Sequence, residues 1–107
     1  MPVTQASLTG SSASGDATSY TTSSVTPSAN QLVLLAVLNT KAASPPTTPT
    51  ASGNGLTYVE VATVTLDTIA SPLKRLTLFR ALGASPSGGV ITIDFASNTQ
   101  TGCIWSV

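Results

Sequence analysis

Gln31-Leu-Val-Leu-Leu-Ala-Val-Leu-Asn-Thr40 contains the longest apolar run of the chain. Its seven consecutive apolar residues, Leu32 to Leu38, are interrupted by no charge and no glycine. A run this short and this apolar is typical of a β-strand that is covered on both faces. We therefore expect a central strand here, with the rest of the chain built outward from it.

Further strand signals follow on both sides of this segment, and turn residues separate them. Ala17 to Val25 is rich in threonine and has one large anchor, Tyr20, which is typical of an exposed or edge strand. Beyond the central strand, the expected strands are residues 56–66, 73–82, 90–96 and 101–107. This spacing predicts an all-β fold, an antiparallel β-sandwich.

The segment from Leu73 to Leu82 allows two interpretations. Ser71 and Pro72 suit the start of a helix, Gly83 suits its end, and the leucines form a helical stripe. Apolar and polar residues also alternate with a period of two, as in a strand. Because the neighbouring segments are all strands, we predict a strand here and keep one helix as the alternative.

Three further segments suggest contacts with other proteins. Residues 1–16 are rich in Ser and Gly and predict an extended N-terminal arm, followed by a single domain over 17–107. Chain ends are ordered only when something ties them down, so we expect this arm to lie against the domain or a neighbouring subunit. Residues 41–54 predict a long proline-rich contact loop. The last strand carries Trp105 and needs either a central place in a sheet or another subunit along its edge.

The composition is nearly free of charge. Four basic residues balance four acidic ones, and charged residues make up 7% of the chain against about 25% in an ordinary domain. Serine and threonine, 33 residues together, supply the polar surface instead. A neutral surface protects a free domain poorly from association, so we expect other proteins to cover much of it. The sequence has no cluster of basic residues of the kind that binds nucleic acid. Its longest apolar run is also far shorter than the ~20 residues that a membrane-spanning helix needs.

The sequence offers no chemistry for an active site. It contains no histidine to act as a base for Cys103, so we expect that cysteine to be a small buried apolar residue. The same lack of ligands predicts no metal and no cofactor. Glu60 and Asp94 could act as a glycosidase-like pair only if they faced each other across a groove, and we expect solvent-facing positions instead. Asn54, between two glycines, predicts a turn. The chain is therefore not expected to be an enzyme.

Three segments resemble a loosely defined group of jelly-roll-like β-sandwich proteins encoded in the structural regions of tailed phages and prophages. They are residues 24–37, Leu76-Thr-Leu-Phe-Arg-Ala-Leu-Gly83, and residues 90–107, which end in Thr-Gln-Thr-Gly-Cys-Ile-Trp-Ser-Val. The resemblance spans most of residues 17–107 and rests on packing motifs. It implies an antiparallel, jelly-roll-like β-sandwich of about six to eight strands. Relatives of this kind continue past Trp-Ser-Val with further strands, so a partner is expected to supply the missing pairing.

Together these features predict a non-enzymatic structural protein of a virus particle, a capsid decoration or a head or tail accessory subunit. We expect it to be made in the host cytoplasm without an export signal, to form a homo-oligomer and to bind a major capsid or tail protein. The expected contact residues are Val3, Leu8, Pro45, Pro46, Pro49, Ile104, Trp105 and Val107. The alternative is a carbohydrate-binding module that stacks sugars on Tyr20, Tyr58 and Trp105.

Overall fold

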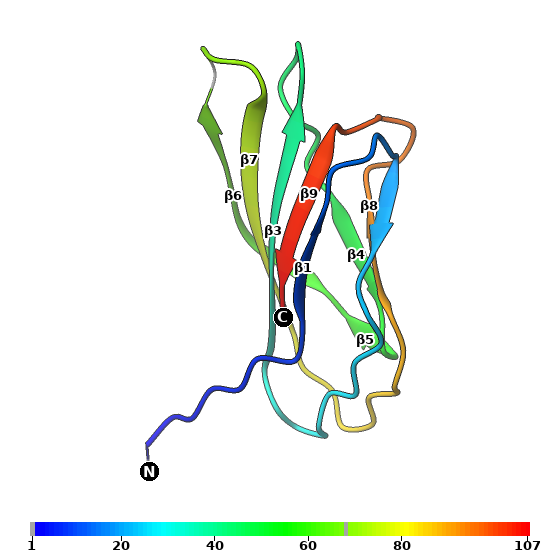
Figure 1. The fold of residues 1–107 in the computed structure, drawn as a ribbon. Coiled ribbons are helices and arrows are strands. Elements are labelled where there is room, and N and C mark those ends of the chain that lie inside the picture. Colours follow the sequence, from blue (N-terminus) through cyan, green and yellow to red (C-terminus); the bar gives the residue numbers. More distant parts are fainter. Residues whose placement is uncertain (1, 68) are drawn as a thin grey trace.

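Strands make up the regular structure of the chain (Figure 1). The structure is a computed structural model and describes residues 2–67 and 69–107. Over these residues the strands are β1 (Gly10–Ala13), β2 (Ser19–Thr21), β3 (Val33–Lys41), β4 (Thr50–Gly53), β5 (Leu56–Thr57), β6 (Val59–Asp67), β7 (Leu73–Ala81), β8 (Ile91–Asp94) and β9 (Gly102–Ser106). The predicted all-β class is confirmed.

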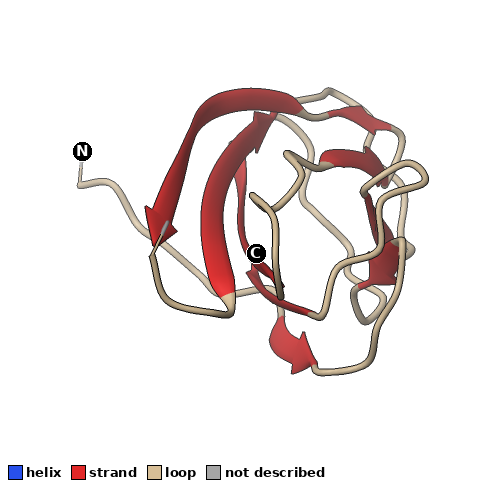
Figure 2. Cartoon of the chain, turned by 90° about the horizontal axis from the view of Figure 1, so that it is seen from above, coloured by secondary structure: helices blue, strands red, loops and turns tan. Residues whose placement is uncertain are grey.

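The strands form two antiparallel sheets that face each other across one core (Figure 2). The five-stranded sheet has the order β1-β9-β3-β7-β6, and the four-stranded sheet has the order β2-β8-β4-β5. The pairing is nested, because β1 pairs with β9, β2 with β8, β3 with β7 and β4 with β5. Segments from opposite ends of the chain therefore lie side by side.

The apolar segment Leu32 to Leu38 lies mostly in β3, the middle strand of the five-stranded sheet. It pairs with β7 over nine residues and with β9 over five. Its burial alternates, since Val33, Leu35 and Val37 are buried while Leu34 is half exposed. The prediction of a central strand is confirmed, but the prediction that both faces are covered is wrong. Only the four-stranded sheet lies over β3, and it covers one face.

The core forms where the inner faces of the two sheets meet. Leu35, Val37 and Phe79 come from one sheet, and Ile91 and Ile93 come from the other. Each of these side chains is at most 3% exposed. Removing a buried aliphatic side chain of this size costs about 2–5 kcal/mol, so these residues fix how the sheets stack.

Two predicted elements divide differently in the structure. The expected strand 56–66 breaks at Tyr58, where the chain leaves β5 in the four-stranded sheet and enters β6 in the five-stranded sheet. The expected loop 41–54 ends early, because residues 50–53 form β4. The turn Gly53-Asn54-Gly55 joins β4 to β5, with φ angles of 57° at Asn54 and 61° at Gly55. Two positive φ angles are what a tight hairpin turn between twisted strands requires.

The segment 73–81 is strand β7, so its period of two predicted it correctly and the helix alternative is wrong. The last strand, β9, lies between β1 and β3 and has no free edge. Its cover comes from residues expected to form the arm, since Gly10 to Ala13 make up β1. Leu8 N also donates a hydrogen bond to the carbonyl of Val107 at 2.8 Å. Residues 8–13 of the expected arm therefore lie against the domain, and residues 2–7 project from it (Figure 1).

Candidate interaction surface

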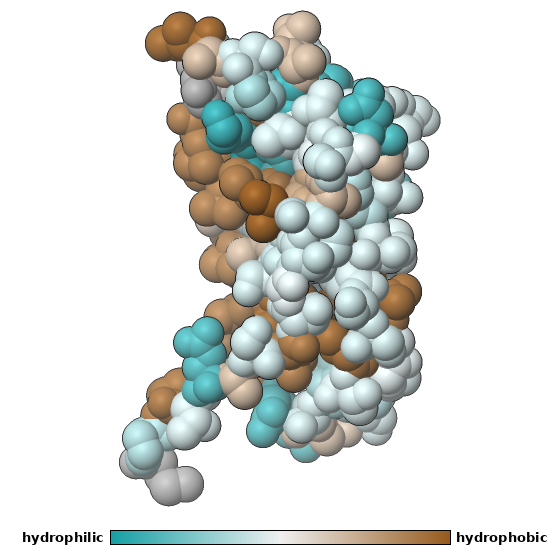
Figure 3. Space-filling model, viewed as in Figure 1, coloured by the Kyte–Doolittle hydropathy of each residue, from teal (hydrophilic) through white to brown (hydrophobic). Residues whose placement is uncertain are grey.

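The outer face of the five-stranded sheet is apolar. We call this surface the apolar face and define it by the outward-facing aliphatic residues Leu34, Ala36 and Leu38 of β3, Leu76 and Leu78 of β7, Val59, Ala62 and Val64 of β6, and Ile104 of β9. Figure 3 shows hydrophobic atoms gathered along the side of the molecule that β6 and β7 form. In the single chain no element of the described residues is packed over this face.

The strand register aligns the largest of these side chains in one row across four strands. Ile104 pairs with Leu38, Leu38 pairs with Leu76, and Leu76 pairs with Val64. Ile104 is 52% exposed, Val64 51% and Leu76 39%. Leu34 and Val59 extend the face toward the far ends of their strands, where both flank Arg80. Cross-strand neighbours of this kind present one continuous aliphatic surface.

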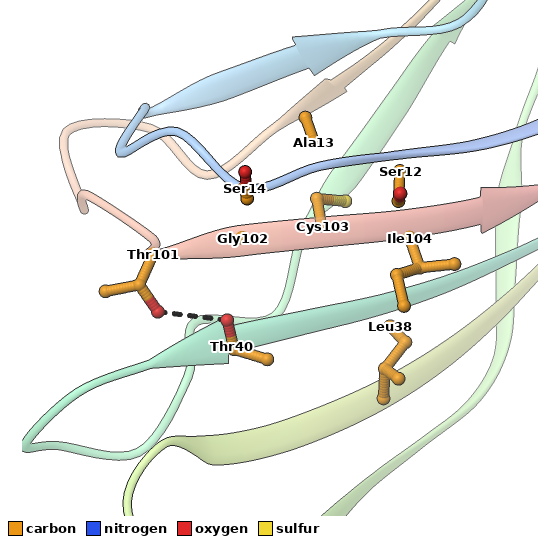
Figure 4. Close-up of a pocket in the computed structure, with 9 residues that line it drawn as sticks. All are labelled: Ser12, Ala13, Ser14, Leu38, Thr40, Thr101, Gly102, Cys103 and Ile104. Atoms are coloured by element: carbon orange, nitrogen blue, oxygen red, sulfur yellow. Dashed lines mark hydrogen bonds between the residues drawn. The ribbon is translucent and has the colours of Figure 1, made fainter.

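Two shallow grooves flank the ridge that Leu38 and Ile104 form on the apolar face. One, of about 270 Å³, runs beside β1 and reaches from Ser12 to Thr40. Figure 4 shows Leu38 and Ile104 side by side at its end, with Thr40 hydrogen-bonded to Thr101 at 2.9 Å. The other, of about 170 Å³, lies between Leu76 and Ile104 on the opposite side of the ridge. The face therefore has relief into which partner side chains could pack.

Gly102 helps to shape the first groove. A Cβ atom at this position would lie 3.2 Å from the Thr40 hydroxyl and 3.3 Å from the carbonyl of Ala13. The absence of a side chain keeps the groove open between β1 and β3.

The outer face of the four-stranded sheet has the opposite character. We call it the hydroxyl face, and its outward-facing residues are Ser19, Thr21, Thr50, Ser52, Thr92 and Asp94. Apart from Thr92, which is half buried, these residues are exposed. In Figure 3 the side of the molecule around β2 and β8 is pale rather than brown. One outer face of the molecule is thus suited to water and the other to burial.

Charge is confined to the margins of the apolar face. In the described residues, Lys74 and Arg80 share the outward register of β7 and lie toward its two ends, with Leu76 and Leu78 between them. Arg75 points the other way, and its Nε donates a hydrogen bond to the carbonyl of Pro46 at 2.8 Å. An uncharged centre with charged margins is the usual anatomy of a protein interface.

The structure separates the predicted contact residues into two groups. Val3, Leu8, Pro45, Ile104 and Val107 are wholly or partly exposed. Pro46, Pro49 and Trp105 are buried in the single chain, so their side chains do not lie on its exposed surface. Pro46 and Pro49 are buried although the loop that carries them lies outside the strands. Trp105 alternates with Ile104 along β9, so only Ile104 points outward.

Two of the three rings named for the carbohydrate-binding alternative are buried in the single chain. Tyr20 and Trp105 are each 7% exposed and belong to the core, while Tyr58 is half buried. Tyr20 instead packs edge-on against Phe95, with ring centroids 6.0 Å apart, and donates a hydrogen bond to the carbonyl of Gly15 at 2.8 Å. Burial raises the pKa of the Tyr20 phenol. Tyr20 and Trp105 therefore present no exposed ring face on which a sugar could stack.

The structure does not bring the candidate catalytic residues together. Cys103 is 2% exposed, and burial raises the pKa of its thiol to about 12, so it is protonated at neutral pH. Glu60 and Asp94 are exposed on strands of different sheets. Within the described residues no three His, Cys, Asp or Glu side chains gather where they could hold a metal ion. The same part of the chain contains no helix long and apolar enough to cross a membrane.

Sequence reasoning missed most of the apolar face. It singled out Ile104 but placed Val64 and Leu76 simply within strands. Part of this face could have been predicted from the sequence, since apolar residues occupy both faces of the segment from Val59 to Leu66. Which of them share a row with Ile104 depends on strand order and register.

Comparison of the chain with models of protein families, with curated proteins and with solved structures finds no match.

Proposed function

We propose that this chain is a non-enzymatic structural subunit of a virus particle, of the kind that decorates a capsid or completes a head or tail. In this proposal the protein is made in the host cytoplasm and resides in the virion. Its role is to bind other proteins of the particle.

The observation that carries the proposal is the contrast between the two outer faces. A solvent-exposed sheet normally alternates apolar residues inward with polar residues outward, as the four-stranded sheet does. The five-stranded sheet instead presents Ile104, Leu76 and Val64 outward. Large contiguous apolar surfaces on a protein mark interaction sites. A subunit fixed in an assembly would bury the apolar face and display the hydroxyl face.

The total surface of the chain supports the same interpretation. The accessible surface is 6036 Å², against about 5,500 Å² for an average monomeric protein of 10.7 kDa. The apolar face and the projecting arm both contribute to this surface. Val3 in the arm is 99% exposed, and residues 2–7 carry no charge. An extended uncharged segment can add to a sheet edge of another protein through its backbone.

We further propose that the fold is a jelly roll. The nested pairing supports this assignment, because a jelly roll is a long antiparallel hairpin wrapped into two sheets. The chain follows that path from β1 and β9 inward to β4 and β5, and β6 extends the five-stranded sheet beyond β7. Jelly rolls serve many functions, so this assignment adds to the proposal only together with the apolar face.

The proposal is tested by asking whether the chain co-purifies with virus particles. Particles from cultures that produce the protein would be separated on a density gradient and probed with an antibody against the chain. We expect the chain in the particle band, at a constant ratio to the major shell protein across preparations. Purified chain added to particles stripped of it should rebind.

Two variants sharpen the experiment. Ile104→Lys should rebind poorly, because it places a charge within the apolar face. Val90→Lys is the matched control, since Val90 is 45% exposed but lies just before β8 in the other sheet. A chain that stays at the top of the gradient in every preparation would refute the proposal.

A further inference from the structure

We infer that the apolar face is covered by the apolar face of a second copy of this chain, so that two five-stranded sheets pack face to face. The inference rests on the proposed function in one respect, since both treat the apolar face as an assembly surface. It goes further by naming the occupant and the arrangement.

The size of the face fits a stable pair. Strands β6, β7, β3 and β9 lie side by side, and three of them are nine residues long. With strands about 4.8 Å apart and about 3.3 Å per residue, the three nine-residue strands and the five-residue β9 cover roughly 500 Å² in projection. Side-chain relief and the flanking strand β1 enlarge the area. A standard stable interface buries about 800 Å² on each partner, a size that this face can supply.

The strand register makes the face complementary to itself. A twofold axis parallel to the strands, between β3 and β7, places β3 of each copy over β7 of the other and β9 over β6. Leu38 then faces Leu76, and Ile104 faces Val64. In the next row, Ala36 faces Leu78, so a small residue meets a large one. Contacts of this reciprocal kind are what a twofold interface requires.

This arrangement also keeps like charges apart. Arg80 of one copy lies over Leu34 of the other, so its aliphatic stem can cover a leucine while its guanidinium reaches the margin. Lys74 lies over Thr40. The other face-to-face twofold axis, along the row of large residues, would set Lys74 over Leu78 and leave Leu34 and Arg80 outside the contact. The first axis buries the whole apolar face.

Light scattering of the purified full chain across a wide concentration range tests the pair directly. We expect a species of twice the 10.7 kDa chain mass. Ile104→Lys and Val64→Lys should each weaken the pair at least tenfold, because each buries an unpaired ammonium group. Val90→Lys should leave it unchanged. The buried Trp105 reports folding, so a blue-shifted emission in every variant shows that loss of the pair is not loss of the fold.

Cross-linking tests the arrangement, in a Cys103→Ala background with a short bismaleimide. Ile104→Cys and Val64→Cys should each give little cross-linked dimer alone and abundant dimer when mixed. Abundant dimer from Ile104→Cys alone would place the axis along the row instead and overturn the arrangement.

The remaining outcomes separate this inference from the proposed function. The chain could be monomeric at every concentration and still bind particles through the apolar face. That result would overturn the inference, because a shell protein would then cover the face, but it would leave the proposed function intact. A pair that Ile104→Lys and Val64→Lys do not weaken would place its interface elsewhere and also overturn it. A pair with the expected contacts in a chain that never enters particles would support the inference and refute the function.

Discussion

Cys103 lies in the core beside the centre of the five-stranded sheet, and its burial makes stability depend on alkaline pH. The pKa of its thiol is about 12 in the folded chain, against 9.0 for an unperturbed thiol. The folded state therefore holds this proton to higher pH than the unfolded state does. The resulting stabilisation is complete below pH 9 and is lost as the pH rises toward 12.

The expected loss at pH 10.5 is about 2 kcal/mol in the free energy of unfolding, relative to pH 8. Urea unfolding at the two pH values measures it. The Cys103→Ala variant should lack this component but keep the losses due to Tyr20 and Tyr58, whose pKa values burial also raises. Equal pH dependence in the two proteins would contradict the assignment.

Asn54 is the second residue whose role can be tested alone. Its side-chain amide donates hydrogen bonds to the carbonyls of Ser87 and Gly89, both at 3.0 Å, and to that of Val25 at 3.3 Å. Its backbone adopts a positive φ, which costs most residues about 1 kcal/mol or more. Asn54→Ala should therefore destabilise the chain by about 2–4 kcal/mol in urea unfolding, through unpaired carbonyls and backbone strain.

Asn98→Ala is the matched control for that measurement. Asn98 is exposed, and its one side-chain hydrogen bond, to the carbonyl of Phe95, is 3.3 Å long. Its loss should cost less than about 1 kcal/mol. If both variants lose the same stability, the turn does not have the role that its contacts indicate.

At the scale of elements, β1 determines whether β9 has a free edge. Deleting residues 2–13 removes the ladder from Gly10 to Ala13 and the hydrogen bonds between Thr9 and Val107. We expect a loss of at least about 2 kcal/mol, since each such bond contributes about 0.5–1.5 kcal/mol net, together with a tendency to aggregate through the bared edge.

Deleting only residues 2–7 is the control for this truncation, because it leaves Leu8 and Thr9 bonded to Val107. The free energy of unfolding should then change by less than about 0.5 kcal/mol. If the long and short deletions are equally stable, β1 is not a structural part of the sheet.

The elements also show how far sequence reasoning reaches. Period-two alternation predicted β7, β8 and β9, because each has one buried face and a clear pattern. It missed β4, whose Ala51 is the only apolar residue of a short strand, and it missed the break at Tyr58. Changing sheets there needs no special residue and is decided by tertiary packing. The Ser and Gly composition of residues 10–13 predicted an extended arm but not its pairing with β9 as strand β1.

At the scale of the whole molecule, the proposed pairing links stability to concentration. A dimer that forms only in the folded state should raise the Tm as the chain concentration increases. We expect the Tm of the wild-type chain to rise by several degrees over a hundredfold increase in concentration, and that of Ile104→Lys to stay constant. Calorimetry at the two concentrations measures both, and a wild-type Tm independent of concentration would contradict the pair.

The apolar face could not be predicted from the sequence because it depends on the order of strands in the whole fold. The sequence indicated an uncharged chain that needs partners, and it singled out Ile104. Which residues surround Ile104 follows from a sheet order in which β9, the last strand, lies between the first and the third. No local pattern encodes that order. The burial of Trp105 depends on it as well, since the same strand at an edge would leave the indole accessible.

The nested pairing of the strands sets an order of events during synthesis. Among the described residues, β1 pairs with no strand but β9, which follows about 90 residues later in the chain. At about 5–20 residues per second, the ribosome needs roughly 5–20 seconds to make the intervening chain. During that time β1 stays unpaired and the core lacks Cys103 and Trp105. The five-stranded sheet is therefore completed only after β9 has been translated. Until then the low charge of the nascent chain gives it little protection against association.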